Sequence, residues 1–221
     1  MRNLLHGVTV ASRIADTVTV LFSGGKDSAV TLHLCRRYFR SVNMAFMYYV
    51  PGLSFQERIV GYYENLCGIE CLRIPHFELS EMLRYGLYRP YDYSVPVVKC
   101  ADVYNYIRSL TGNYWLAGGE RIDDSIVRRA MIKRAGSVDD KRGRFYPLAE
   151  WSKTDVNEYI AKNNLRFGEE SAVLGHSFRS FDRGTLLAVE EHYPRDFELI
   201  KRWFPLCRAG MMDGKNETSA V

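Results

Sequence analysis

A short polar stretch near the N-terminus has the composition of a phosphate-binding turn. It reads SGGKDS and directly follows the β-branched, apolar segment Thr17–Phe22. Adjacent glycines let a ligand approach the backbone closely. The free N–H groups at the start of a following helix, with its positive dipole end, favour an anion, and two hydroxyls and a lysine add contacts. The predicted phosphate cradle consists of Ser23, Gly24, Gly25, Lys26, Asp27 and Ser28.

The acidic residue in this stretch separates it from two better-known phosphate motifs. The Walker pattern requires Ser or Thr after the lysine, but Asp27 stands there, and the spacing is not that of a dinucleotide GxGxxG motif. A bare carboxylate would repel phosphate, so Asp27 indicates that a divalent cation, Mg²⁺, shares the site. The alternative is a tight turn whose glycines only relieve backbone strain.

A second group of candidate residues follows the short apolar segment 114–117. Its two arginines are seven residues apart, so side chains from adjacent helical turns can reach one anionic ligand, and arginine grips phosphate or sulfate in a bidentate manner. The alternative is a solvated helix with salt bridges to Asp123 and Asp124. The candidates are Gly118, Gly119, Arg121, Ser125 and Arg128.

Strands and helices alternate around both groups. Apolar and β-branched runs predict strands over 17–22, 43–50, 69–74 and 114–117. Helical spacing and stop signals predict helices over 28–40, 55–66, 78–87 and 101–110, with a loop over 89–96. Alternation of this kind predicts an α/β fold with a doubly wound, mostly parallel sheet that binds ligands at the carboxyl ends of its strands.

Helices and loops dominate the expected structure after residue 120. Ser152 and Asp155 form a capping box that opens a helix through Lys162. Two more helices are expected over 184–191 and 195–204, separated at Pro194. We therefore expect a core over 1–150, a helical extension packed on it over 151–212, and a disordered tail over 213–221.

Three segments resemble one known superfamily. SGGKDS resembles the PP-loop of the ATP pyrophosphatases and sulfonucleotide reductases, which share an adenine nucleotide α-hydrolase-like, Rossmann-type three-layer fold. Residues 119–128 are similar to the GxRxxES…R segment of phosphoadenosine phosphosulfate (PAPS) reductases, and 146–160 to their PL…W…DV…YI stretch, which serves mainly packing. The resemblance spans roughly 17–205 and is closest to the PAPS reductase branch.

The resemblance implies that the cradle and rim bind an adenine nucleotide, ATP with Mg²⁺ or PAPS. It implies catalytic roles for Lys26, Asp27, Arg121 and Arg128, with Asp27 near the metal. Gly52 is expected at the rim after the second strand, although the family's aspartate is absent there. The implied nucleotide-binding residues are Ser23, Gly24, Gly25, Lys26, Asp27, Ser28, Gly52, Gly118, Gly119, Arg121 and Ser125.

The chain departs from the reductases in its cysteines. It lacks their C-terminal Glu-Cys-Gly-Leu-His segment and has only Cys207 late in the chain, where Arg208 would lower the thiol pKa. The alternative is an ordinary structural thiol. Cys100 stands alone, so we expect no iron–sulfur cluster.

His176, Arg179 and Arg183 are expected either as a lid over the bound anion or as a solvated loop.

Three functions remain open from the sequence. The first is cleavage of ATP between its α and β phosphates to adenylate an acceptor in sulfur-transfer or modification chemistry. The second is PAPS reduction by Cys207 with a thioredoxin-like reductant. The third is contact with tRNA or DNA, because residues 121–144 carry eight Lys or Arg against four Asp.

Composition limits the remaining classes. The chain has 221 residues, 47% hydrophobic and 25% charged, with a formal net charge of +4. No signal peptide or membrane span is apparent, so we expect a cytoplasmic protein without membrane contact. Five cysteines without a CxxC pair argue against a disulfide framework. The oligomeric state is not indicated.

Overall fold

A six-stranded sheet forms the centre of the protein. The computed structural model describes residues 4–212, and its strand order is β3-β2-β1-β4-β6-β5. Neighbouring strands are parallel except for the antiparallel pair β5–β6. The strands are β1 Thr17–Leu21, β2 Ser41–Tyr48, β3 Cys71–Pro75, β4 Leu116–Ala117, β5 Val138–Asp139 and β6 Arg144–Phe145. The predicted α/β fold with a mostly parallel sheet is confirmed.

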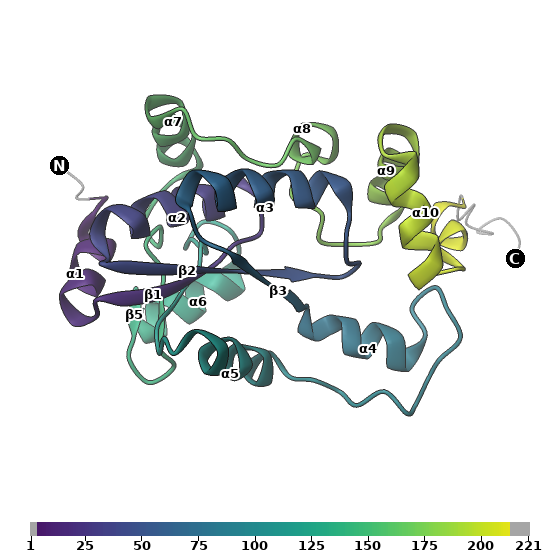
Figure 1. Ribbon diagram of the computed structural model, residues 1–221, viewed down its shortest axis with the longest axis horizontal. Coiled ribbons are helices and arrows are strands. Elements are labelled where there is room, and N and C mark those ends of the chain that lie inside the picture. The colour runs from purple at the N-terminus through teal and green to yellow at the C-terminus, as the bar shows by residue number, and fades with distance from the viewer. Residues whose placement is uncertain (1–3, 213–221) are drawn as a thin grey trace, which may run out of the picture.

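Helices cover both faces of this sheet (Figure 1). Helices α2 and α3 lie over one face, and α5 lies against the other. The helices are α1 His6–Ile14, α2 Lys26–Tyr38, α3 Ser54–Cys67, α4 Phe77–Tyr85, α5 Cys100–Thr111, α6 Ile126–Ala135, α7 Lys153–Asn163, α8 Glu170–Leu174, α9 Arg183–His192 and α10 Pro194–Trp203, followed by a 3₁₀ turn, η1 Cys207–Met211. The helices and strands expected from the sequence are present, with ends displaced by one or two residues.

Burial explains why β1 is so apolar. It is paired on both sides, by β2 and β4, and Val18 and Val20 are completely buried. Strands covered on both faces are expected to be continuous apolar runs. The polar exception, Thr19, accepts a hydrogen bond from Asn113 Nδ2 at 3.1 Å, so its hydroxyl is satisfied inside the protein.

Several elements were not expected from the sequence. Helix α1 packs Val8 and Ala11 into the main core, although polar residues interrupt its apolar pattern. Strands β5 and β6 have two residues each, which is too short for a periodicity to register. Helices and loops do dominate after residue 120, as expected, and these two short strands at the edge of the sheet are the unexpected addition.

The C-terminal helices pack in two different places. Helix α7 contributes Val156 and Ile160 to the main core beside α2. Helices α9 and α10 form a second cluster with the start of α3, through Phe55, Phe197 and other aromatic side chains. The division at residue 150 stays a prediction, and the expected tail over 213–221 lies outside the described residues. Across residues 4–212, none of the helices has the length and apolarity to cross a membrane.

Candidate active site

The glycine turn joins the end of β1 to the start of α2. Gly24 has φ +78°, and a Cβ atom there would lie 2.9 Å from Ile59 Cγ2, so the position favours glycine on both grounds. Gly25 is the N-cap of α2 and, among the described residues, no side chain caps this helix. The first amides of α2 are thus free of a side-chain acceptor and suit an anion.

Two hydroxyls hold the shape of the turn. Ser28 Oγ donates to the Gly25 carbonyl at 2.9 Å, and Ser23 Oγ lies 3.2 Å from Ser28 Oγ. The Gly25 amide donates to Ser23 Oγ at 3.4 Å. Ser28 is buried and Ser23 is exposed, which gives Ser28 a structural position and leaves Ser23 accessible to a ligand.

The rim after β4 approaches the turn closely. A Cβ atom at Gly119 would lie 3.1 Å from both the backbone carbon and Cβ of Asp27. Arg121 Nε lies 3.1 Å from Asp27 Oδ1, and Arg121 Nη2 lies 2.7 Å from Asp124 Oδ1. The structure therefore brings together the two groups of candidates that lie far apart in the sequence.

The buried guanidinium group of Arg121 does not have all of its hydrogen bonds made. Arg121 is only 9% exposed, yet its Nε and Nη1 atoms and Asp27 Oδ1 are buried without a hydrogen bond. Burial raises the pKa of Asp27, and the Arg121 guanidinium partly offsets this increase. Nε and Oδ1 face each other as an ion pair, which leaves Arg121 Nη1 as the atom without a partner. Because buried polar atoms are normally paired, Nη1 indicates a place for an anionic ligand.

Ser125 and Arg128 lie at the start of α6. Ser125 is the N-cap of α6, and its hydroxyl accepts from the Arg128 amide at 3.1 Å. Arg128 Nη1 pairs with Asp124 Oδ2 at 2.9 Å, with its side chain 47% exposed. Arg121 precedes α6 instead of lying on it, so the expected reach from adjacent helical turns is wrong. Asp124 holds both guanidinium groups together.

Lys26 reaches across to α7. Its Nζ atom donates to Asn157 Oδ1 at 3.3 Å and lies 5.1 Å from the centroid of the Phe167 ring. The ammonium group therefore sits beside the turn, at the point where residues 166–178 begin to cover it.

Residues 166–178, which we call the strap, run over the glycine turn. The Gly168 amide donates to the Gly24 carbonyl at 2.8 Å. A Cβ atom at Gly25 would lie 3.4 Å from Ser177 Oγ. Tyr63 donates to the Arg166 carbonyl at 2.6 Å, which fixes the start of the strap to α3.

The three charged residues expected as a lid are spread along and beyond the strap. His176 Nδ1 lies 2.9 Å from the Ser177 carbonyl. Arg179 is exposed, and Arg183 Nε donates to the Met211 carbonyl at 3.1 Å, near the described C-terminal end. Ser177, which the sequence did not single out, makes the contact with the turn instead.

The remaining candidates, Gly52 and Cys207, lie in different surroundings. Gly52 has φ +77° in the turn after β2, with no atom near its missing side chain. Cys207 is completely buried in the second cluster. Burial raises the pKa of this thiol and outweighs Arg208, whose guanidinium pairs with Glu190. Arg208 lowers the pKa of Cys207, as expected, but burial raises that pKa by more.

Two buried charged residues near the site, Arg144 and Glu170, were not identified as site candidates from the sequence. Arg144 pairs with Glu120 at 2.9 Å directly beyond Gly118. Glu170 in the strap is completely buried, and neither carboxyl oxygen has a hydrogen-bond partner. Burial raises the pKa of Glu170 to about 7. No motif or apolar period marks these positions, because their burial arises only from the tertiary fold.

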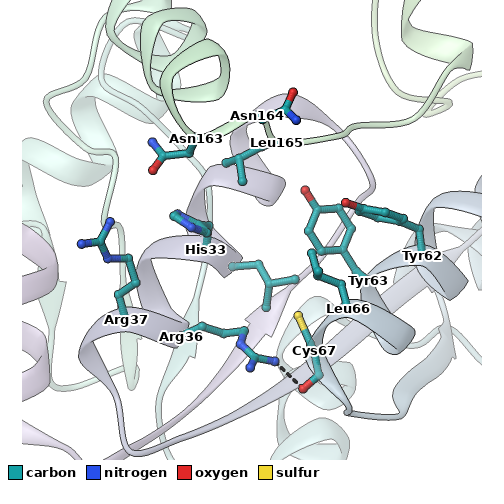
Figure 2. A pocket seen from close by; sticks show the side chains of 11 residues that line it. His33, Arg36, Arg37, Tyr62, Tyr63, Leu66, Cys67, Asn163, Asn164 and Leu165 are labelled. Carbon is teal, nitrogen blue, oxygen red and sulfur yellow. Dashed lines mark hydrogen bonds between the residues drawn. The ribbon is translucent and has the colours of Figure 1, made fainter.

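A separate cavity of about 450 Å³ lies between α2 and α3 (Figure 2). Arg36, whose guanidinium donates to the Cys67 carbonyl, and Asn163 lie on its walls. His33 also lines it, and its Nδ1 atom lies 3.0 Å from the Tyr159 hydroxyl. Residues of the glycine turn and of the rim do not line this cavity. We therefore keep it apart from the candidate site.

Metal-binding clusters were also sought in the described chain. Between residues 4 and 212, no group of three or more His, Cys, Asp or Glu side chains is placed to hold a metal ion. Asp27 alone contributes a carboxylate to the glycine turn. The absence of an iron–sulfur cluster stays a prediction.

Comparisons with known proteins support the motif assignments. The sequence model described as the phosphoadenosine phosphosulfate reductase domain matches residues 17–169. Sulfate adenylyltransferase subunit 2 of Mycolicibacterium vanbaalenii is 27% identical over 227 residues, covering 89% of this chain and 71% of that protein. The Mycobacterium tuberculosis protein of the same name is 25% identical over 218 residues, which cover 85% of this chain and 68% of that protein.

One solved structure bears on the fold. The U34-tRNA thiolase NcsA of Methanococcus maripaludis has a TM-score of 0.50 at 16% identity, covering 97% of this chain and 81% of that one. This likeness concerns the fold alone. The matched segment contains the glycine turn, the rim and the first part of the strap, and it spans more than half of the chain. The chain therefore belongs to the phosphoadenosine phosphosulfate reductase domain family of enzymes.

Proposed function

We propose that this protein binds ATP with Mg²⁺ at the glycine turn and transfers the adenylyl group to an acceptor in sulfur chemistry. The relatives named sulfate adenylyltransferase subunit 2 support adenylyl transfer. Their name also supports a partner subunit and makes sulfate a candidate acceptor. In the reaction, an acceptor oxygen bonds to the α phosphorus, and the bond from that phosphorus to the bridging oxygen breaks. Pyrophosphate leaves with the electron pair.

The glycine turn suits the leaving pyrophosphate. Its backbone amides and the N-terminal dipole end of α2 would hold the β and γ phosphates. Lys26, beside the turn, adds a positive charge. Because charge builds on the leaving group as the bond breaks, donors fixed in advance stabilise the transition state more than they stabilise bound ATP.

The single observation that carries this proposal is the contact between Asp27 and Arg121. It joins the start of α2 to the rim after β4 and leaves Arg121 Nη1 buried without a hydrogen bond. A guanidinium group held in this way can donate to a phosphate oxygen without first moving. We assign Arg121 to charge stabilisation and Arg128, through Asp124, to holding it in position.

Mg²⁺ fits the turn as a companion of the nucleotide. The Asp27 side chain is 39% exposed beside the glycine turn, and Mg²⁺ in nucleotide sites commonly takes one or two carboxylates plus phosphate oxygens. Asp27 would hold the ion, which neutralises phosphate charge when bound.

PAPS reduction has weaker support, because it requires an accessible thiolate, whereas Cys207 is buried and its pKa is raised.

The test measures nucleotide binding and product formation in parallel. Wild-type protein is titrated with ATP and Mg²⁺ and assayed for pyrophosphate, with sulfate as the acceptor, and separately with PAPS and thioredoxin for sulfite. Lys26→Ala and Asp27→Asn should each abolish binding or turnover. The control Lys153→Ala, on an exposed residue of α7, should change neither. Thermal melting establishes that each variant is folded.

Two outcomes would contradict the proposal. ATP titrations unchanged in both variants would separate the turn from nucleotide binding. Sulfite formation that disappears in Cys207→Ser would establish the reductase instead.

A further inference from the structure

A basic cavity lies beside the β5–β6 edge of the sheet. It has a volume of about 470 Å³, and no aspartate or glutamate lines it within the described chain. Four of its lining residues are cationic and three are tyrosines. The residues that carry the argument are Tyr104, Arg108, Tyr114, Lys141, Arg142 and Arg144.

The turn between β5 and β6 is held rigidly over this cavity. Arg108 on α5 donates through Nε to the Tyr114 carbonyl at 2.8 Å and through Nη2 to the Arg142 carbonyl. The Tyr114 hydroxyl donates to the Asp140 carbonyl. Because two of these hydrogen bonds fix its backbone, at the Asp140 and Arg142 carbonyls, the turn presents Lys141 and Arg142 in a preorganised way.

The base of the cavity carries a buried cation. Arg144 is only 6% exposed, and its guanidinium carbon lies 4.6 Å from the centroid of the Tyr104 ring. One nitrogen, Nη2, pairs with Glu120 at 2.9 Å, while Nε is buried without a hydrogen bond. A buried guanidinium with an unused donor at the wall of a cavity points to an anionic ligand.

The basic surface continues beyond the turn. A second cavity of about 680 Å³ shares Lys141 and Arg142 with the first and adds Arg134 from α6. Asp139 and Asp140 line this second cavity, but Asp139 is buried and lies 3.6 Å from Arg142, whose side chain is 69% exposed. Three cations there face one exposed carboxylate, that of Asp140. A net positive charge therefore extends across the turn from α5 to α6, which suits an extended anionic ligand.

The cations and tyrosines of this surface suit a ligand that has repeated phosphates and flat rings. Single-stranded nucleic acid is bound by basic grooves that follow its backbone and by aromatic side chains on which bases stack. Tyr114 is 50% exposed beside the cavity and offers one such face. We propose that the hairpin surface, defined as Arg108, Tyr114, Arg134, Lys141, Arg142 and Arg144, binds single-stranded nucleic acid. This inference goes beyond adenylyl transfer and does not depend on it.

The test is fluorescence anisotropy with labelled single strands of about 20 nucleotides, sufficient to cover one site. RNA and DNA of the same sequence are compared, at low salt and without ATP. The wild type should bind at least one of them in the micromolar range, and affinity should fall steeply with salt. Lys141→Glu combined with Arg142→Glu should weaken binding at least about tenfold and reduce the salt slope.

The matched control applies the same change of charge elsewhere. Lys153→Glu combined with Lys162→Glu alters exposed residues of α7 and should leave binding unchanged. Equal loss in both double variants, or no binding at low salt, would overturn the proposal. Competition by a mononucleotide as strong as by the oligonucleotide would overturn it in favour of a small anion site.

Failure of this inference is distinguishable from failure of the proposed function. The Lys141/Arg142 variant should keep its ATP titration, and Asp27→Asn should keep its oligonucleotide binding. Loss of oligonucleotide binding in Asp27→Asn would place the strand at the glycine turn and overturn the assignment to the hairpin surface.

Discussion

Gly119 is the residue at which the rim meets the glycine turn. Adding a methyl group there places a Cβ atom 3.1 Å from the backbone carbon of Asp27, and backbone yields less easily than a flexible side chain. We expect Gly119→Ala to displace the start of α2 from Arg121. Affinity for ATP should fall about tenfold or more, which corresponds to about 1.4 kcal/mol. Isothermal titration with ATP and Mg²⁺ measures this change.

Gly61 supplies the matched control for that substitution. It lies inside α3, and a Cβ atom there would have no atom within 4 Å apart from its chain neighbours and the backbone of its own helix. Gly61→Ala should leave ATP binding unchanged and stabilise the fold by about 0.5–1 kcal/mol, because alanine favours helix. If Gly119→Ala binds ATP as tightly as Gly61→Ala, the close approach at the rim has no role in binding.

At the residue scale, the sequence predicted only the contiguous part of the site. Gly24, Gly25 and Asp27 could be identified because their chemistry and their position after a strand are local properties. Glu170 and Ser177 could not be identified, because their places depend on how the strap crosses the turn. Arg121 was identified with its phosphate-binding chemistry, but its contact with Asp27 required the fold.

At the scale of elements, the strap contains a carboxyl group that is stabilised in its protonated form. The pKa of Glu170 is raised from its ordinary 4.5 to about 7, chiefly by burial, with a smaller increase from Glu169 and a small decrease from Arg58. Between these pKa values the folded protein holds a proton that the unfolded chain releases. The free energy of unfolding should therefore fall as pH rises from about 4.5 to 7, by up to about 3 kcal/mol.

Glu170→Gln tests this effect directly. The amide cannot ionise, so the free energy of unfolding of the variant should not fall as pH rises from about 4.5 to 7. The variant should therefore be more stable than the wild type near pH 8. Urea unfolding near pH 5 and near pH 8 measures the difference. Glu158→Gln, at an exposed position of α7, should retain the wild-type pH dependence. Parallel stability curves for Glu170→Gln and the wild type would contradict the assignment.

Element prediction succeeded where a periodic pattern was long enough. Helix α7 was predicted from its capping box, and Ser152 and Asp155 do cap it reciprocally. Strands β5 and β6 were not predicted, because two residues carry no alternation. The β5–β6 turn is held instead by Arg108, from a distant part of the chain.

At the scale of the whole molecule, the main core depends on residues beyond 150. Trp151, Val156 and Ile160 are buried in the same cluster as β1 and α2, and Trp151 Nε1 donates to the Leu4 carbonyl at 2.7 Å. Each large apolar side chain contributes about 1.5–3 kcal/mol when buried. Their sum is comparable with the roughly 5–15 kcal/mol that separates folded from unfolded domains.

A fragment of residues 1–150 should therefore fail to fold cooperatively. Circular dichroism and calorimetry should show no sharp thermal transition in the fragment and a clear one in the full chain. A cooperative transition in the fragment would establish 1–150 as an independent domain. The sequence predicted a boundary at residue 150, but the packing of α7 against α2 across that point required the structure.

The binding position of ATP tests the central claim most directly. A crystal structure with Mg²⁺ and an ATP analogue that cannot be cleaved between its α and β phosphates would locate every phosphate. We predict that the β and γ phosphates lie on the amides of residues 24–28, with Arg121 Nη1 donating to a phosphate oxygen. Phosphates bound elsewhere, for example against Lys141 and Arg142, would contradict the account.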